Sequence, residues 1–264
     1  MADIIEHPTG IAPAVPALRP VTYADVKASF QDGIADFVRA PAFGLFFGAI
    51  YALGGLLLLA CVFSLDLGYL GYPLFAGSVL IGPFVAAGLY EVSRELEAGR
   101  TPTWRGVFST VFDQRKRELG WMAFVSIFAF IIWMYQVRLL LALFLGFASF
   151  ASLQEFVRVL TTTSDGLSFL AVGHVVGAAL ALGLFSISVI SFPLLMDRDV
   201  DVVTAMITSV QAVLLSPGPM ITFGASVVAL IFIGAAPAFL GLILVLPVLG
   251  HATWHLYRRA TRPA

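Results

Sequence analysis

The chain has 264 residues, of which 59% are hydrophobic and only 12% are charged, and its formal net charge is −1. Soluble domains carry about 25% charged residues, so this composition predicts an integral membrane protein and excludes an ordinary soluble domain. The near-zero net charge offers no basic surplus for binding nucleic acid, which we do not expect as a partner.

Residues 1–21 contain several prolines and no apolar core, which is typical of a disordered tail rather than a signal peptide. We expect the first membrane helix to direct insertion instead. The single cysteine, Cys61, excludes an internal disulfide. It lies in an apolar run and is expected to be a small buried residue.

Six apolar stretches approach the length that a bilayer-crossing helix needs, about 20 residues. They cover residues 41–64, 69–90, 119–138, 167–192, 218–235 and 237–257. The last two form one run that is too long for a single crossing, and a turn predicted at 234–237 divides it, because glycine and proline break helices. The sequence thus predicts an all-α, polytopic membrane helix bundle with six transmembrane helices. It forms one domain over residues 22–259, with a short tail at 260–264.

Residues 139–150 are apolar but too few to cross the membrane and return. They either prolong the third helix as a tilted rod or lie on the outer face, so the conformation of residues 139–166 stays open. The polar residues between Gln154 and Gly166 are expected to form the one sizeable external segment.

Three polar connections carry apolar residues at helical spacing, at 26–37, 104–112 and 203–214. Each predicts a cytoplasmic amphipathic helix that leads into a pair of membrane helices and suits the headgroup region. Val26, Phe30, Ile34 and Phe37 form the apolar face of the first one. Such helices either brace the bundle or sense lipid, and we favour bracing.

A short sequence block occurs in two of the three resulting units. Pro41 precedes a Phe-Gly-Ala triplet at 47–49, and Pro217 precedes the same triplet at 223–225. The block predicts an internal repeat in which an amphipathic helix is followed by a helix hairpin. The middle unit lacks the triplet, so its membership of the repeat is a conjecture.

Basic residues predict the orientation, because Lys and Arg are retained on the cytoplasmic side. With six crossings, the N-terminal tail, the second and fourth connections and the C-terminal tail share one side and hold most of the basic residues. Only Arg138 and Arg158 fall on the other side. We therefore expect both termini in the cytoplasm and Arg138 at the outer end of the third span, as an interfacial anchor.

Polar residues gather where three of the spans return to the cytoplasmic side. They are Glu91, Arg94, Glu95, Asp197, Arg198, Asp199, Asp201, His251 and His255. As ion pairs they would neutralise one another and tie the helix ends together. The same residues would suit a proton- or cation-handling site. The sequence leaves both alternatives open.

His251 and His255 are four residues apart and share one helix face, a spacing that could hold a metal if carboxylates joined them. Trp254, Tyr257 and Arg258 around them are also typical of an aromatic and basic membrane boundary, which is the interpretation we favour. The chain lacks nucleotide-binding and hydrolase motifs. We therefore assign it no catalytic residue, cofactor or metal site and do not expect an enzyme.

Three separated motifs are similar to those of a known family. They are GSVLIGPFVAAGLYEVSRELE at 77–97, SFPLLMDRDVD at 191–201 and PVLGHATWHLYR at 247–258. With them, the chain resembles bacterial integral membrane proteins grouped as a domain of unknown function, some of which carry names borrowed from cytochrome c oxidase subunit I. The resemblance implies a bacterial inner-membrane protein and brings no established activity. The oxidase activity would need about six histidine ligands for its haems and copper, and this chain has 4 histidines, so we reject it.

Together these observations predict a multi-pass protein of the bacterial inner membrane that acts as a non-enzymatic structural, lipid-associated or assembly component. The alternative is a small transporter or channel that uses the carboxylate and histidine cluster. A weaker alternative is a metal- or haem-binding accessory protein of a respiratory complex. Membrane lipid is the expected partner, together with a membrane protein or a second copy of the chain.

Overall fold

The structure is a computed structural model and describes residues 16–63, 71–115, 118–146 and 153–261. Within these residues every regular element is a helix. The helices are α1 (Tyr23–Arg39), α2 (Pro41–Phe63), α3 (Gly71–Glu97), α4 (Trp104–Arg115), α5 (Glu118–Leu145), α6 (Leu153–Thr162), α7 (Ser164–Ser188), α8 (Ser191–Asp197), α9 (Val202–Leu215), α10 (Pro217–Ala235) and α11 (Leu242–Thr261).

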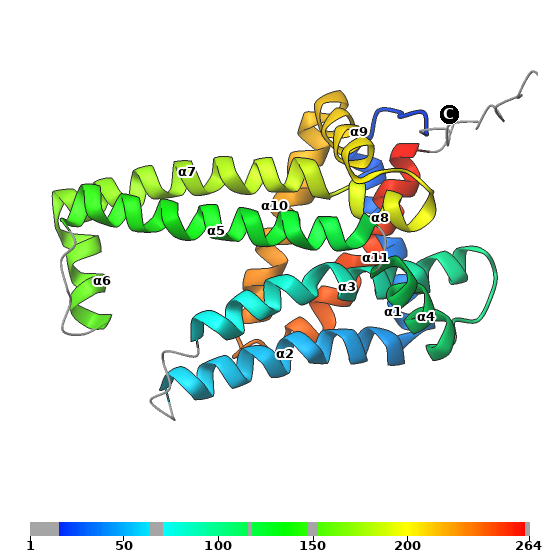
Figure 1. The fold of residues 1–264 in the computed structure, drawn as a ribbon, viewed down its shortest axis with the longest axis horizontal. Coiled ribbons are helices and arrows are strands. Elements are labelled where there is room, and N and C mark those ends of the chain that lie inside the picture. Colours follow the sequence, from blue (N-terminus) through cyan, green and yellow to red (C-terminus); the bar gives the residue numbers. More distant parts are fainter. Residues whose placement is uncertain (1–15, 64–70, 116–117, 147–152, 262–264) are drawn as a thin grey trace, which may run out of the picture.

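The long helices pair as three hairpins, α2 with α3, α5 with α7 and α10 with α11. A shorter helix precedes each hairpin: α1, α4 and α9, respectively. In Figure 1 the α2–α3 and α5–α7 hairpins extend in the same direction from an end at which α1, α4, α8 and α9 gather. This order agrees with the predicted sequence of three units, including the middle one.

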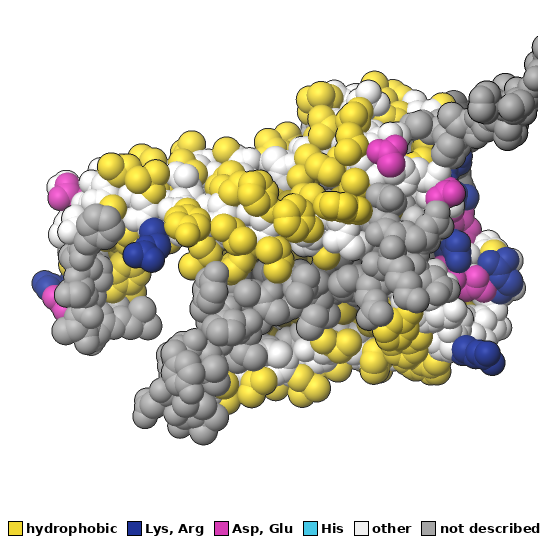
Figure 2. All heavy atoms as spheres, in the orientation of Figure 1, with side chains coloured by type: hydrophobic (Ala, Val, Ile, Leu, Met, Phe, Trp, Pro, Cys, Tyr) yellow, Lys and Arg dark blue, Asp and Glu magenta, His cyan; other side chains and the backbone are white. Residues whose placement is uncertain are grey.

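Each of the six predicted spans falls largely within a long helix of the described residues, and the chain is an all-α membrane helix bundle. Four segments are long and apolar enough to cross a membrane by length and composition: Pro41–Cys61, Gly120–Leu145, Ser164–Asp197 and Pro217–Ala235. Hydrophobic side chains cover α5 and α7 in Figure 2, and charged ones gather mainly at the ends of the molecule. Helices α3 and α11 are more polar, so a total of six crossings stays a prediction.

The division of the last apolar run is confirmed. Helix α10 ends at Ala235 and α11 begins at Leu242, five residues later than predicted. The turn needs this extra length because Ala238 and Phe239 adopt left-handed backbone angles, with φ of 51° and 67°. Residues other than glycine rarely adopt such angles, because their Cβ atom crowds the backbone.

The third long helix continues beyond the predicted span of 119–138. Helix α5 continues to Leu145 rather than stopping near Arg138, because residues 139–145 are all apolar and good helix formers. Residues 139–145 therefore prolong the helix, one of the two alternatives above, and 147–150 lie outside the described residues. Arg138 lies within α5, about 10 Å along the axis from its last residue. The segment that is predicted to be external contains α6, which lies across the far end of α5 and α7 (Figure 1).

The face that α1 buries also differs from the expectation. Helix α1 packs along α11, and its buried residues are Val26, Ser29, Gly33 and Asp36, whereas Ile34 is 52% exposed. Small residues face α11 because the two backbones approach closely at Gly33. A Cβ atom on this glycine would lie 2.7 Å from the backbone nitrogen of Ala252. The contact agrees with bracing of the bundle by α1.

The repeated proline block recurs in the backbone as well as in the sequence. Ala40, before the first proline, has φ −135° and ψ 56°, and Ser216, before the second, has φ −143° and ψ 61°. The helical region is disfavoured for a residue that precedes proline, so the chain bends at the same point in both copies of the block and a new helix begins there. The following Phe47 and Phe223 are both buried.

Replacement of Gly33 by alanine should destabilise the protein, because the added methyl group meets the α11 backbone, which cannot move aside. We expect Gly33→Ala to lower the free energy of unfolding by about 1–3 kcal/mol, measured by thermal unfolding of the purified protein in detergent. Gly54→Ala in α2 is the control, since a Cβ atom there meets nothing within 4 Å. Equal melting temperatures for the two variants would contradict the close contact.

Candidate functional site

A polar cavity of about 300 Å³ opens at the charged end of the molecule, between α1, α3 and α11. It combines three arginines, three carboxylates and one histidine. These are Asp32, Asp36, Arg39, Glu97, His255, Arg258 and Arg259. Helix α1 contributes the first three residues, α3 contributes Glu97, and α11 contributes the rest.

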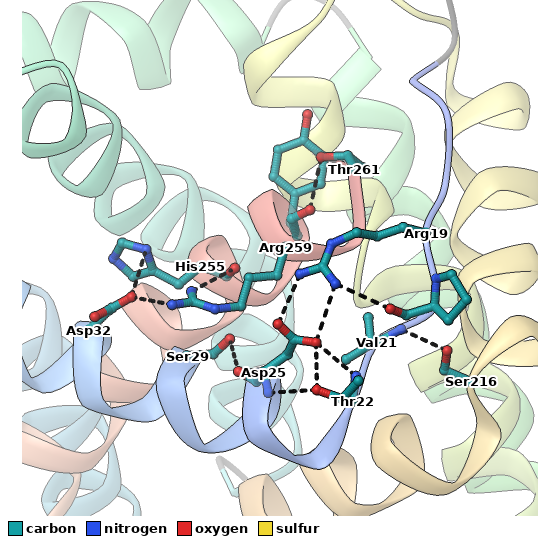
Figure 3. Close-up of polar contacts among 12 residues, drawn as sticks. Arg19, Val21, Thr22, Asp25, Ser29, Asp32, Ser216, His255, Arg259 and Thr261 are labelled. Carbon is teal, nitrogen blue, oxygen red and sulfur yellow. Dashed lines mark hydrogen bonds and ion pairs between the residues drawn. The ribbon is translucent and has the colours of Figure 1, made fainter. Parts of the chain in front are cut away.

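Asp36 and His255 form a close polar contact in this cavity, across 219 residues of sequence. His255 Nε2 lies 2.7 Å from Asp36 Oδ2, and its Nδ1 lies 3.9 Å from Asp32. Asp32 in turn accepts a hydrogen bond of 2.6 Å from Arg259 (Figure 3). Two consecutive turns of α1 are therefore held to α11 by charge-assisted hydrogen bonds, which are stronger than neutral ones.

Burial alone would raise the pKa of Asp36, because it disfavours the charged carboxylate. Hydrogen bonds from His255 and Ser93 and the nearby rings of His255 and His251 outweigh this effect, so the pKa of Asp36 lies below its ordinary value. Asp36 is consequently ionised at neutral pH. It is a hydrogen-bond acceptor toward both α11 and α3.

His251 lies deeper than the cavity and is fully buried. Its Nδ1 atom is 2.8 Å from the Ser93 hydroxyl oxygen of α3. Its Nε2 atom has no hydrogen-bond partner among the residues that the structure describes. Polar side chains thus lead inward from the cavity, from Asp36 through Ser93 to His251.

A second group of contacts joins α11 to the ends of α3 and α8. The Tyr257 hydroxyl donates to Asp197 at 2.6 Å, and Arg258 reaches the same carboxylate at 3.2 Å. Arg258 also contacts Glu97 at 3.1 Å, and the Trp254 indole nitrogen donates to Glu97 at 3.2 Å. Trp254 and Tyr257 are buried. The expectation of an aromatic belt at the membrane boundary is therefore wrong, because these rings pack inside the bundle.

The other residues of the predicted cluster form local contacts. Arg94 pairs with Glu91 at 2.7 Å, and Arg100 pairs with Glu95 at 2.8 Å, each within one helix or its end. Asp201 caps α9 by accepting from the Thr204 backbone nitrogen at 2.9 Å.

Arg198 lies 3.8 Å from the adjacent Asp197, and Asp199 is exposed. No contact joins Glu91, Asp197 and His251 to one another. The predicted cluster is therefore divided into separate pairs. Among the described residues, no three His, Cys, Asp or Glu side chains are placed to hold a metal ion.

Sequence reasoning missed Asp32, Asp36 and Ser93. Asp32 and Asp36 are four residues apart and so lie on one side of α1. This spacing was the available signal, but both residues fall on the polar face of an amphipathic pattern, which is normally solvated. Their pairing with α11 depends on a contact between distant segments.

A comparison with known proteins finds a matching family for the central part of the chain. Residues 71–197 match DUF2189, a family described as a predicted integral membrane protein. The match confirms the predicted resemblance over the motif at 77–97 and over residues 191–197 of the second motif. Residues 198–201 and the motif at 247–258 lie outside it. No curated protein and no solved structure matches the chain. The DUF2189 segment contributes Ser93, Glu97 and Asp197 to the contacts above, whereas α1 and α11, which flank it, supply their partners.

The low pKa of Asp36 links the stability of the protein to pH. A carboxyl group whose folded-state pKa is depressed stabilises the fold above its unfolded pKa of about 3.9 and loses this contribution as the pH falls through the folded pKa. We expect Asp36→Asn to lower the free energy of unfolding at pH 7 by about 1–3 kcal/mol. The difference in free energy of unfolding between wild type and variant should disappear as the pH falls below about 4.

Thermal unfolding in detergent across this pH range provides the measurement. Asp165→Asn is the control, because Asp165 is exposed at the start of α7. A difference that stayed constant down to pH values well below about 3 would show that the Asp36 carboxylate does not stabilise the fold through its charge.

Proposed function

We propose that the protein is a non-enzymatic structural component of its membrane that associates with lipid. The observation that carries this proposal is the pairing of charged residues between helices at one end of the bundle. Asp32 and Asp36 of α1, Glu97 of α3 and Asp197 of α8 each accept from α11. These carboxylates hold four segments together, because each of them accepts a hydrogen bond from α11.

The outer surface supports an association with lipid. Phe124 and Phe128 of α5 are 60% and 55% exposed, and Leu143 near its end is 69% exposed. Such side chains are stable in hydrocarbon but not in water. The α5–α7 hairpin therefore presents its apolar side chains to acyl chains or to a membrane-protein partner.

We further propose that the charged end faces the cytoplasm of a bacterium, with the protein in the inner membrane. The basic residues of the tails and of the second and fourth connections support this orientation by the positive-inside rule. The described ends of the chain also lie together, since the Arg19 backbone nitrogen donates to the Ala260 carbonyl oxygen at 2.9 Å. This hydrogen bond supports an arrangement in which both ends share one side of the membrane.

A second candidate function is proton or cation transport. It is favoured by the inward series from Asp36 through Ser93 to His251, whose Nε2 atom is buried without a partner. Buried polar groups normally find hydrogen-bond partners, and intramembrane ionisable residues often belong to proton pathways. This series, rather than the full predicted cluster, is the feature on which a transport function would depend.

The structural proposal predicts that loss of an interhelical hydrogen bond affects stability and not flux. We expect Tyr257→Phe to lower the free energy of unfolding by about 1 kcal/mol, because Asp197 loses its hydroxyl donor. Tyr135→Phe, at an exposed tyrosine of α5, should have no effect.

In proteoliposomes with an imposed pH gradient, wild-type protein should not raise proton leakage above that of empty liposomes. Leakage that required His251, and was lost in a His251→Gln variant that still folded, would favour the transport function over the structural one.

The orientation is tested with single cysteines in a Cys61→Ser background. Ala98→Cys lies in the connection after α3 at the charged end, and Ser164→Cys lies at the opposite end, at the start of α7. A membrane-impermeant maleimide should label residue 164 in intact spheroplasts and residue 98 only in inverted vesicles. The reverse labelling pattern would contradict a cytoplasmic charged end.

A further inference from the structure

Arg39 differs from the other two arginines of the cavity. Arg258 is paired with Glu97 and Asp197, and Arg259 is paired with Asp32. No hydrogen bond or ion pair engages the Arg39 guanidinium among the residues that the structure describes. Arg39 is exposed, so the cavity presents a cation whose five N–H donors are open to a ligand, which suits the oxygens of a phosphate group.

The position of Arg39 along the chain places it at the level of lipid headgroups. It lies two residues before Pro41, the first residue of an apolar segment long enough to cross a membrane. The polar headgroup layers occupy only about 5–8 Å on each side of the hydrocarbon. A group bound at Arg39 is consequently at the depth where lipid phosphates lie.

The charges of the cavity indicate what kind of headgroup would fit. Three arginines and three carboxylates line it, so both signs are present and their formal charges cancel. The side chain of Asp32 is 45% exposed, although it also accepts from Arg259. A purely anionic ligand would meet these carboxylates and be repelled, whereas a zwitterion matches both signs.

We propose that the cavity binds the headgroup of a zwitterionic phospholipid with a primary ammonium group. Its phosphate lies against Arg39 and its ammonium group lies against Asp32. The volume of about 300 Å³ is at the lower end for ligand pockets, which suits a headgroup rather than a whole lipid. The acyl chains then follow the exposed apolar residues of α2, among them Leu45 and Leu53. This inference rests on the proposed association with lipid and names the class of lipid.

The test uses the full-length protein, delipidated in detergent and titrated with phosphatidylethanolamine, phosphatidylglycerol or phosphatidylcholine, with bound lipid counted by native mass spectrometry. We expect phosphatidylethanolamine to bind at least about tenfold more tightly than the other two lipids. Arg39→Gln should weaken the binding of phosphatidylethanolamine about tenfold. Asp32→Asn should abolish the preference for phosphatidylethanolamine over phosphatidylglycerol. Arg105→Gln is the matched control, because it removes a cation from an exposed position of α4 that lies outside the cavity.

Competition distinguishes a lipid headgroup from a free anion. Soluble glycerophosphoethanolamine should displace the lipid, and inorganic phosphate should not do so at the same concentration. Equal displacement by phosphate, equal binding of the three lipids, or unchanged affinity in Arg39→Gln would each overturn this inference while leaving a general lipid association intact. Failure to bind any of the three lipids would contradict the proposed function as well.

Discussion

The contact between α1 and α11 is the interaction on which the charged end of the molecule depends. Gly33 lets the two backbones approach so closely that no side chain fits between them at that point. This approach brings Asp32 and Asp36 within reach of His255 and Arg259. With α11 fixed from one side, Tyr257 and Trp254 on its other faces meet α8 and α3. Gly33 therefore helps to set the position of a helix that also contacts α2, α3, α8 and α10. Helices α1 and α11 form two walls of the cavity.

The long hairpins depend on a different balance of forces. Side chains on α5 and α7 remain largely exposed in the bundle. The α2–α3 and α5–α7 hairpins contact each other through α3 and α5 and diverge toward the far end in Figure 1. In water such surfaces would collapse on one another, but in lipid the acyl chains are as apolar as leucine and supply no force that drives helices together. Packing there needs small residues or polar contacts. The charged end has both, which explains why the contacts between units concentrate at that end while the hairpins diverge away from it.

Local signals predicted most of the fold. The apolar lengths, the glycine and proline near 234–237 and the repeated proline block each act over a few residues, and the structure places helices and breaks accordingly. The buried face of α1 was not predictable in this way. Its apolar residues suggested a face with Ile34, yet the side against α11 is selected by the absence of a side chain at Gly33. Local signals were likewise insufficient to predict which residues of the site contact one another. His251 and His255 were recognised from their spacing, whereas Ser93 and Asp36, their partners, lie 158 and 219 residues away, and only the tertiary contact reveals them.

The long separation between Asp36 and His255 also has a consequence for the time course of biosynthesis. Chains are made at about 5–20 residues per second, so a partner 219 residues downstream is completed roughly 10–40 s later. During that interval α1 and the first hairpin must remain at the membrane with both aspartates solvated. The charged end therefore closes last, after every helix before α11 has been inserted. A ribosome that stalls before α11 would leave an inserted bundle whose first helix lacks its most extensive packing partner, with Asp32 and Asp36 left without theirs.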